Sequence, residues 1–327
     1  MNIWTVPSPG TTRTAVMTIA AILCVPLGTL VPAPAPASEG GASLYMDGAY
    51  NDFAAAIAGP PGLGLRNDIF RYDAKVLTRS PKGQVIPGVD QTSWVNNLKI
   101  GYISDIKLLG GTYGAAVAIP YVLDIEVGGP VTRADGSTFA SGHNAGLGDL
   151  YLLPVEIYWT WGNQHLALVP GIIAPTGTFH ANVIFNNGHN YWAFDPSIAY
   201  TWLDARRGHE FSFTAGLLIN TENRATQYRT GNEFHLDWTA AQYLSEHLAL
   251  GVTGYWYEQV SEDDGLFPSG LDAHDFHASG AGIGPIFLYE TKIGGRTWDF
   301  IGKWISDVHS RNRFNGDVVM FSIGVQL

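Results

Sequence analysis

Residues 316–327 read GDVVMFSIGVQL and alternate in character from one position to the next. Large apolar side chains occupy every second position, at Val319, Phe321, Ile323, Val325 and Leu327. The positions between the last of these hold Ser322, Gly324 and Gln326. Because successive side chains of a β-strand point to opposite faces, this stretch predicts a strand with one apolar face and one polar face.

The same alternation recurs elsewhere in the chain. Residues 210–220 place apolar side chains on one face, at Phe211, Phe213, Ala215, Leu217 and Ile219. The opposite face is polar, with Glu210, Ser212, Thr214 and Asn220. Two further segments carry ionisable side chains on one face, at Glu233, His235 and Asp237 and at Asp299, Lys303 and Asp307. In a membrane barrel these faces would line the lumen, whereas in a soluble sheet they would face solvent.

The composition agrees with either kind of all-β protein. The chain is 46% hydrophobic and 12% aromatic, with 14% charged residues, whereas average soluble domains carry about 25% charged residues. Low charge, many aromatics and 39 glycines suit a membrane barrel, in which one face needs no charge, and they also suit a secreted all-β domain. The net charge of −11, without a basic patch in the sequence, argues against nucleic-acid binding.

Residues 1–37 have the features of a secretory signal peptide. Arg13 is the only charged residue before Glu39, an apolar stretch covers residues 15–30, and an Ala-Pro-Ala sequence ends at Ala37. These features predict export and cleavage near Ala37. A transmembrane anchor is the competing interpretation, although a proline and a glycine interrupt the apolar stretch. The only cysteine, Cys24, lies in this leader, so we expect a mature chain without disulfides or thiol chemistry.

After the leader, the chain predicts strands joined by two kinds of connection. Strands are expected at residues 68–78, 94–104, 111–127, 147–161, 165–174, 191–203, 210–220, 233–244, 247–260, 276–290, 297–308 and 316–327. Connections at 162–164, 204–209 and 245–246 are short, whereas those at 128–146, 175–190, 221–232 and 261–275 are long. Short turns on one side and long loops on the other are typical of outer-membrane barrels. We predict an all-β, antiparallel transmembrane β-barrel of about twelve strands at residues 67–327, after an N-terminal segment at 38–66, with an antiparallel sandwich as the alternative.

Large aromatic side chains gather near the ends of the predicted strands, on their apolar faces. They are Trp159, Trp161, Trp192, Phe194, Tyr200, Trp202, Trp298, Phe300 and Trp304. Amphipathic rings prefer the boundary between membrane and water, which produces aromatic girdles in membrane barrels. In a sandwich the same rings would fill the core, where each indole N–H would need a partner. This placement favours the barrel.

Several short motifs, each of them ordinary turn chemistry by itself, follow one another along the mature chain. They are Glu39-Gly40-Gly41, Gly59-Pro60-Pro61-Gly62, Gly146-Leu147-Gly148-Asp149, Pro170-Gly171 with Pro175-Thr176-Gly177, Phe194-Asp195-Pro196-Ser197, and Lys303-Trp304 followed by Asn312-Arg313-Phe314-Asn315-Gly316-Asp317. In these motifs and their order the chain resembles the meta-pathway phenol degradation or SphA-like family of outer-membrane proteins. It departs from such barrels in ending on Leu327 rather than on an aromatic residue. The resemblance implies a barrel distantly similar to long-chain fatty-acid and toluene channels, a role in uptake of hydrophobic compounds, and no defined catalytic residues.

The N-terminal segment carries aromatic side chains among small ones, including Tyr50 and Phe53. An open aqueous pore does not select apolar solutes, so such a segment could act as a plug in the lumen. The alternative is a tail in the periplasm. We predict a channel for passive uptake of small hydrophobic compounds, aromatic ones among them. Tyr50 and Phe53, together with Phe185 and Tyr191 in or beside a long loop, are the candidate solute contacts, because aromatic faces stack with aromatic solutes.

Two other functions are weighed against uptake. A structural or surface-binding barrel without transport is the first, and a lipid-modifying barrel enzyme that uses His309 and Ser310 is the second. His274 and His277 are spaced as metal ligands are in many loops, but no second cluster in the sequence accompanies them. We therefore expect no enzymatic activity, metal or cofactor. The expected partners are small hydrophobic solutes, the lipid bilayer with lipopolysaccharide, and the barrel assembly machinery, without nucleic acid.

Overall fold

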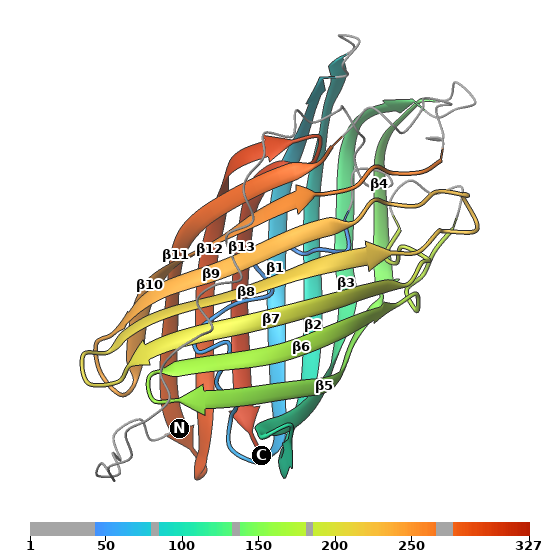
Figure 1. The fold of residues 1–327 in the computed structure, drawn as a ribbon. Helices are drawn as coiled ribbons and strands as arrows, with labels where there is room; N and C mark the ends of the chain where they lie inside the picture. Colours follow the sequence, from blue (N-terminus) through green and yellow to red (C-terminus); the bar gives the residue numbers. More distant parts are fainter. Residues whose placement is uncertain (1–42, 80–84, 133–137, 181–185, 266–276) are drawn as a thin grey trace, which may run out of the picture.

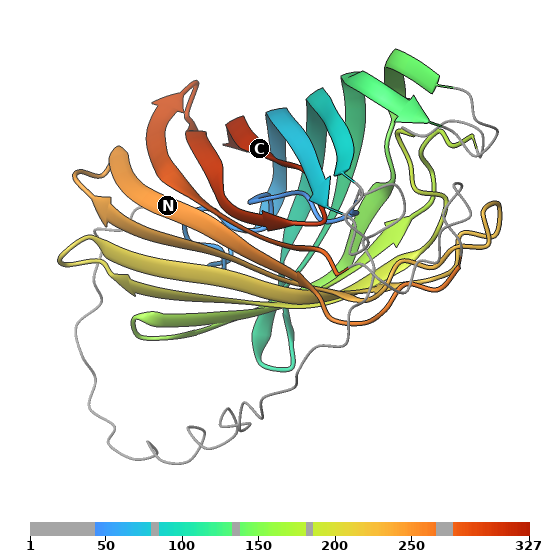
Figure 2. The ribbon, with the colours of Figure 1, turned by 90° about the horizontal axis from the view of Figure 1, so that it is seen from above.

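The computed structural model describes residues 43–79, 85–132, 138–180, 186–265 and 277–327. Within them, one antiparallel sheet of thirteen strands forms the wall (Figures 1 and 2). The strands are β1 (Gly62–Arg79), β2 (Val85–Leu108), β3 (Gly111–Thr132), β4 (Thr138–Leu147), β5 (Leu150–Trp161), β6 (Gln164–Ala174), β7 (Ala193–Asp204), β8 (His209–Asn220), β9 (Glu233–Tyr243), β10 (Leu248–Gln259), β11 (Ser279–Ile293), β12 (Arg296–Arg311) and β13 (Asn315–Gln326). Twelve of them close into a barrel, because β2 pairs with both β1 and β3, while β4 pairs with β3 outside this ring. The predicted barrel is confirmed.

The prediction was wrong about residues 128–146, which were expected to form one long loop. The structure continues β3 to Thr132 and begins β4 at Thr138, and the two strands pair as in Gly128↔Ser141. Small residues at many of these positions conceal the alternation on which the sequence-based assignment depends. The strands β4 and β5 run in the same direction along β3, one after the other, with a break at Gly148 and Asp149.

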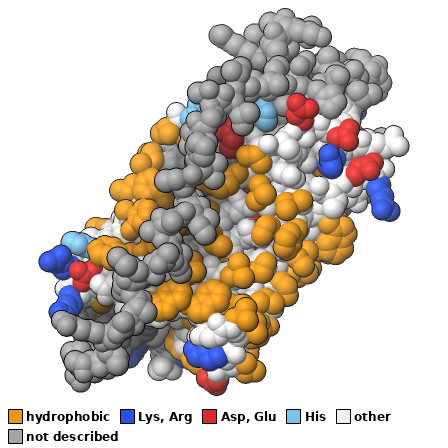
Figure 3. All heavy atoms as spheres, in the orientation of Figure 1, with side chains coloured by type: hydrophobic (Ala, Val, Ile, Leu, Met, Phe, Trp, Pro, Cys, Tyr) orange, Lys and Arg blue, Asp and Glu red, His pale blue; other side chains and the backbone are white. Residues whose placement is uncertain are grey.

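The two faces of each strand differ as the alternation predicts. In β7, Phe194 and Ile198 point outward and are 45% and 46% exposed, whereas Asp195 and Thr201 point inward and are buried. Figure 3 shows the hydrophobic side chains spread over the outer surface, with many of the charged ones near its two ends. The apolar faces therefore meet lipid and the polar faces line the lumen, which rules out the soluble sandwich. Among the described residues, no helix has the length and apolarity that crossing a membrane requires.

The aromatic residues expected to form girdles lie on the outside of the barrel. Trp161, Trp192 and Trp304 are among the exposed large side chains of the wall. The indole nitrogen of Trp304 donates to Asp317 Oδ1 on the next strand at 3.0 Å, so its polar atom is paired while the side chain stays exposed on the outer surface. An apolar body with one satisfied polar atom is the arrangement that suits the membrane boundary.

Residues 43–58 cross the inside of the barrel and do not form a tail outside it (Figure 2). The amide of Ala54 donates to Glu210 Oε1 on β8 at 2.6 Å. Asp52 forms an ion pair with Arg66 on β1, which lies opposite β8 in the ring of strands. The segment thus contacts both sides of the wall. The expected lumen segment is confirmed, and the alternative of a periplasmic tail is wrong. The predicted signal peptide and its cleavage near Ala37 lie outside the described residues.

Candidate solute site in the barrel lumen

Besides the pair of Asp52 with Arg66, two ion pairs attach the N-terminal segment to the wall. Asp52 Oδ1 lies 2.6 Å from Lys303 Nζ on β12, and the Lys303 side chain is completely buried. The same ammonium donates to the carbonyl oxygen of Asn51 at 3.0 Å. Asp47 Oδ1 lies 2.6 Å from Arg313 Nη2, in the turn between β12 and β13. Because an unpaired buried charge is costly, each of these pairs favours the docked position of the segment.

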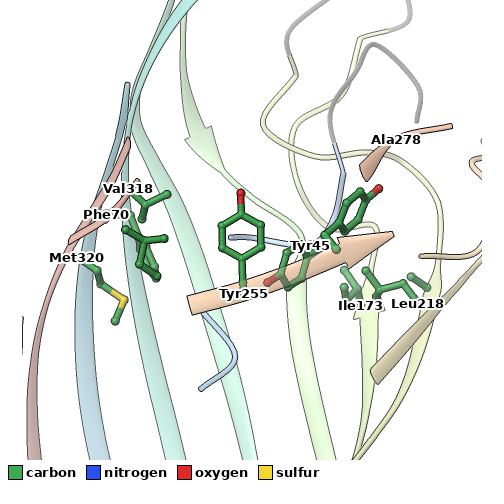
Figure 4. Close-up of a cluster of buried hydrophobic side chains, with 11 residues drawn as sticks. Tyr45, Phe70, Ile173, Leu218, Tyr255, Ala278, Val318 and Met320 are labelled. Carbon is green, nitrogen blue, oxygen red and sulfur yellow. The ribbon is translucent and has the colours of Figure 1, made fainter. Parts of the chain in front are cut away.

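Where the segment meets the wall, rings from both form a group that we call the aromatic cluster. Its members are Tyr45 and Tyr50 of the segment and Tyr151, His235, Tyr255 and Tyr257 of the wall. The ring of Tyr45 lies 5.4 Å from that of Tyr257 at 13° and 5.1 Å from that of His235 at 24°. Figure 4 shows Tyr45 and Tyr255 within a larger group of buried side chains. Offset stacking at these separations is favourable.

The aromatic cluster is surrounded by buried carboxylates that accept hydrogen bonds from its phenol groups. The pairs are Tyr45 Oη to Asp237 Oδ2 (2.9 Å), Tyr257 Oη to Glu233 Oε1 (2.5 Å) and Tyr151 Oη to Asp195 Oδ2 (2.8 Å). His235 lies between two of these acids, with Nε2 3.1 Å from Asp195 Oδ1 and Nδ1 3.8 Å from Asp237 Oδ2. The site thus offers ring faces for stacking and oxygen atoms that accept hydrogen bonds.

The structure separates the residues that the sequence proposed as solute contacts. Tyr50 belongs to the aromatic cluster, with its ring 4.5 Å from that of His235. Phe53 packs edge-on against Tyr243, at 6.2 Å, in a different group of apolar side chains. Tyr191 is buried just before β7, with its ring edge-on to His189. Phe185 lies outside the described residues. The part that each plays in solute contact stays a prediction.

Sequence reasoning did not select Tyr45, Tyr255 or Tyr257 as site residues. A signal was available, because Tyr255 and Tyr257 alternate with Gly254, Trp256 and Glu258 and so share one face of β10. His235 and Asp237 were expected to line the lumen, and they do, with both side chains buried. That they meet Tyr45 could not be read from strand periodicity.

Comparison with known proteins places the chain in a family. The sequence profile described as "Putative MetA-pathway of phenol degradation" matches residues 76–323. The chain belongs to this family. The resemblance inferred from the short motifs is therefore confirmed. No curated protein matches the chain.

Solved structures of outer-membrane proteins are similar to this family member. An outer membrane channel from Pseudomonas putida F1 superposes with a TM-score of 0.66 at 15% identity, over 84% of this chain and 99% of that chain. At such identity the similarity establishes the fold alone. A Pseudomonas aeruginosa FadL homologue gives a TM-score of 0.38 at 10% identity, over 90% of this chain and 98% of that chain. The TodX deltaS2S3 mutant monoaromatic hydrocarbon channel gives 0.41 at 8% identity, over 82% and 90%.

One of the motifs that suggested the family acquires a role in the structure. Arg313, in the turn motif at residues 312–317, inserts its guanidinium over the ring of Tyr257 at 4.3 Å and pairs with Asp47. The turn itself is held by Asn312, whose φ is 54° and whose side-chain amide donates to His277 O at 2.8 Å. A Cβ at Gly280 would lie 2.9 Å from Arg313 Nη1, so the glycine leaves room for the guanidinium.

Two other motifs, distant in sequence, meet where β4 ends. Asp149 Oδ1 accepts a hydrogen bond from the Gly177 amide (2.9 Å), and Oδ2 accepts one from the His189 amide (2.6 Å). A Cβ at Gly177 would lie 2.6 Å from Gly188 Cα, so the backbones here approach too closely for a side chain. Asp149 therefore holds both ends of the connection between β6 and β7 against the break between β4 and β5.

A second carboxylate, at the same end of the barrel, organises the connections that follow β8 and β10. Asp263, in the connection after β10, accepts hydrogen bonds from the hydroxyl of Tyr228, the Gly231 amide (2.6 Å) and Gln259 Nε2 (2.5 Å). Burial raises the pKa of the Asp263 carboxyl from its ordinary value of 3.8 to about 6, with the nearby charge of Glu233 adding to the rise. The protonation state of the Asp263 carboxyl therefore changes around pH 6.

The two residues considered for lipid hydrolysis, His309 and Ser310, each contact other residues of the wall. Ser310 Oγ donates to the carbonyl oxygens of Arg313 and Phe314, each at 3.1 Å, while His309 Nε2 lies 3.2 Å from Ser279 Oγ. His309 and Ser310 therefore do not form the pair that a hydrolase would need. Within the described part of the chain, no three His, Cys, Asp or Glu side chains are grouped to hold a metal ion. His274 falls outside that part.

Proposed function

We propose that this barrel is an outer-membrane channel through which small hydrophobic compounds, aromatic ones among them, pass without energy input. The observation that carries the proposal is the aromatic cluster in the lumen, which the wall and the N-terminal segment build together. Its rings offer a stacking surface to an apolar solute. The description of the family by phenol degradation, and of the similar Pseudomonas putida protein as an outer membrane channel, support the same role.

In this mechanism the solute is captured at the long loops, rests at the aromatic cluster and then passes the N-terminal segment. Tyr191 lies at the end of a long loop, Tyr50 in the aromatic cluster, and Phe53 against Tyr243, close to where β9 ends in a short turn. These three residues, with Phe185, are the solute contacts that we propose. Successive aromatic surfaces allow a solute to move by small steps without entering bulk water.

We propose that the N-terminal segment, within residues 38–66, acts as the plug of this channel. It contacts several strands through hydrogen bonds, ion pairs and ring contacts, and none of these contacts is covalent, so it can yield to a solute. Deletion of residues 42–58 should raise the conductance of the barrel in planar bilayers and reduce its preference for apolar solutes. Unchanged conductance and unchanged solute preference would contradict this role.

The uptake proposal is tested in cells. Uptake of labelled phenol and labelled toluene at limiting concentration is measured in cells that lack the protein and in complemented cells. Slower uptake of either compound without the protein, restored on complementation, is the expected result. Equal rates, with the barrel confirmed in the outer membrane, would instead support a structural or surface-binding barrel. A phospholipase assay on the purified protein, with and without calcium, tests the lipid-modifying alternative.

We also propose that the chain reaches this membrane by export, with cleavage near Ala37, and that the barrel assembly machinery inserts it among lipopolysaccharide. The apolar outer surface and the period-2 wall support insertion as a barrel. The intact mass of protein purified from outer membranes should match a chain that begins at Ser38. A mass that retains the leader would contradict cleavage.

A further inference from the structure

The side chain of Tyr45 is bound in the lumen in the way that a small ligand would be bound. Tyr45 is 3% exposed, and its ring stacks on Tyr257 and His235. Its hydroxyl donates to Asp237 Oδ2 at 2.9 Å. The partners come from β9 and β10, whereas Tyr45 comes from the plug. The wall therefore contains a complete receptor for a phenol ring.

The polar part of this receptor has unused capacity. Asp237 Oδ1 and His235 Nδ1 are buried and have no hydrogen-bond partner among the described residues. Both side chains are at most 1% exposed. Buried polar atoms usually find partners, so atoms that lack one mark a place where a further donor or acceptor can be accommodated.

We propose that the lumen wall carries a binding site for a single aromatic ring that bears a hydrogen-bond donor, and that Tyr45 is its resident occupant, which an incoming solute displaces. The site consists of Asp237, His235, Tyr255 and Tyr257. Its ligand class is phenols and aromatic amines. The role of the site in transport rests on the proposed channel function, whereas binding at the site does not.

The chemistry of the site separates solutes of similar shape. A ring without a donor would leave the buried Asp237 carboxylate without the hydrogen bond that Tyr45 supplies, which is costly in a desolvated site. A ring with a carboxylate would bring a further negative charge beside Asp237 and Glu233, and like charges at close range repel. Phenol should therefore bind better than anisole, toluene or benzoate.

The attachments of the plug allow Tyr45 to leave by itself. Asp47 and Asp52, which hold the segment on Arg313 and Lys303, both follow Tyr45 in the chain. A tethered ring competes with free solute at an effective concentration on the order of millimolar or higher. The wild-type site should therefore bind phenol weakly, and removal of the occupant should expose its full affinity.

The test is binding of phenol to purified Tyr45→Ala barrel, whose lost ring leaves a cavity of the ligand's own shape. Phenol and anisole are compared by calorimetric titration and by the midpoint of thermal unfolding, with circular dichroism to verify the fold. Phenol should bind roughly tenfold or more tightly than anisole, because only phenol restores the hydrogen bond to Asp237. Phenol should also recover part of the unfolding midpoint that the substitution lowers.

Two variants serve as controls. Phe53→Ala removes a plug ring whose neighbour Tyr243 meets it edge-on, away from the Asp237 site, so its cavity should show no preference for phenol over anisole. Adding Asp237→Asn to Tyr45→Ala should reduce the preference strongly. Equal binding of phenol and anisole by folded Tyr45→Ala, or binding of neither, would overturn the site. Failure of cellular uptake with this binding intact would overturn the channel function and leave the site in place.

A second variant, which keeps the ring, tests the proposal if Tyr45→Ala does not fold. Tyr45→Phe retains the stacking on Tyr257 and loses only the hydroxyl that Asp237 accepts. In titrations of the purified barrel, the half-saturating phenol concentration of this variant should be several-fold lower than that of the wild type, because the substituted ring is bound less tightly. An unchanged half-saturating concentration would show that Tyr45 does not occupy the phenol site.

Discussion

The two faces of β9 are held by different kinds of contact, although they belong to one stretch of chain. Leu236 and Trp238 point outward on the lipid-facing side, whereas His235 and Asp237 point inward and are buried. The outer side chains need only be apolar, because lipid has no fixed partners. The inner ones each need particular partners at hydrogen-bond distance. The outer face therefore determines that the chain enters a membrane, and the inner face determines what the barrel does there.

The largest loss in free energy of unfolding is expected from breaking an ion pair inside the barrel. Lys303→Met removes the ammonium that pairs with Asp52 and leaves that buried carboxylate with Arg66 as its remaining cation. Loss of one partner from a buried pair costs about 3 to 5 kcal/mol. Urea unfolding in lipid vesicles measures the change. The double variant Lys303→Met with Asp52→Asn should recover part of it, and Lys292→Met, on an exposed position of β11, should change little.

A charge on the outer face gives the next largest effect, for the opposite reason. Ile198→Arg places a guanidinium in the middle of β7, where the wild-type side chain is 46% exposed on the outer surface. A charge near the bilayer midplane destabilises a barrel by about 2 to 4 kcal/mol. Folding into vesicles, followed by the shift in electrophoretic mobility, measures the loss. Ile198→Leu should fold as the wild type does, and an equally severe loss in that variant would contradict the lipid-facing assignment.

A smaller loss of stability is expected at the break between β4 and β5, which a connection rather than strand pairing holds in place. Asp149→Ala removes the acceptor of the Gly177 and His189 amides and leaves both half-buried donors without this partner. Such groups cost about 1 to 3 kcal/mol. The connection between β6 and β7 should become sensitive to limited proteolysis while the barrel stays folded. Asp149→Asn, which keeps one carbonyl oxygen as an acceptor, should show an intermediate sensitivity.

The smallest effect is a pH dependence of the loops around Asp263. The folded protein raises the pKa of this carboxyl to about 6 from 3.8, so the folded state binds the proton more tightly than the unfolded state. The resulting stabilisation is present below pH 3.8 and is lost as the pH rises through 6. Protection of the Gly231 amide from hydrogen exchange should fall over this range, by on the order of 1 kcal/mol. Asp263→Asn should remove the pH dependence, and a dependence of opposite sign would contradict the assignment.

Strand periodicity alone predicted which side chains face lipid and which face the lumen. The period of two is a property of the extended backbone, so it can be read wherever both faces differ in polarity, as in residues 210–220. It failed at residues 128–146, because small residues there leave the two faces alike. The short and long connections likewise predicted a barrel with turns on one side and loops on the other.

The sequence by itself determined an outer-membrane-type barrel with a polar interior and an aromatic N-terminal segment. Only the tertiary structure decided that Tyr45 meets Asp237, 192 positions away, and that Asp47 meets Arg313, 266 positions away. Periodicity gives the direction of a side chain but not the side chain that it meets across the lumen. That meeting depends on the closure of the ring between β2 and β3, and on the path of the N-terminal segment through it.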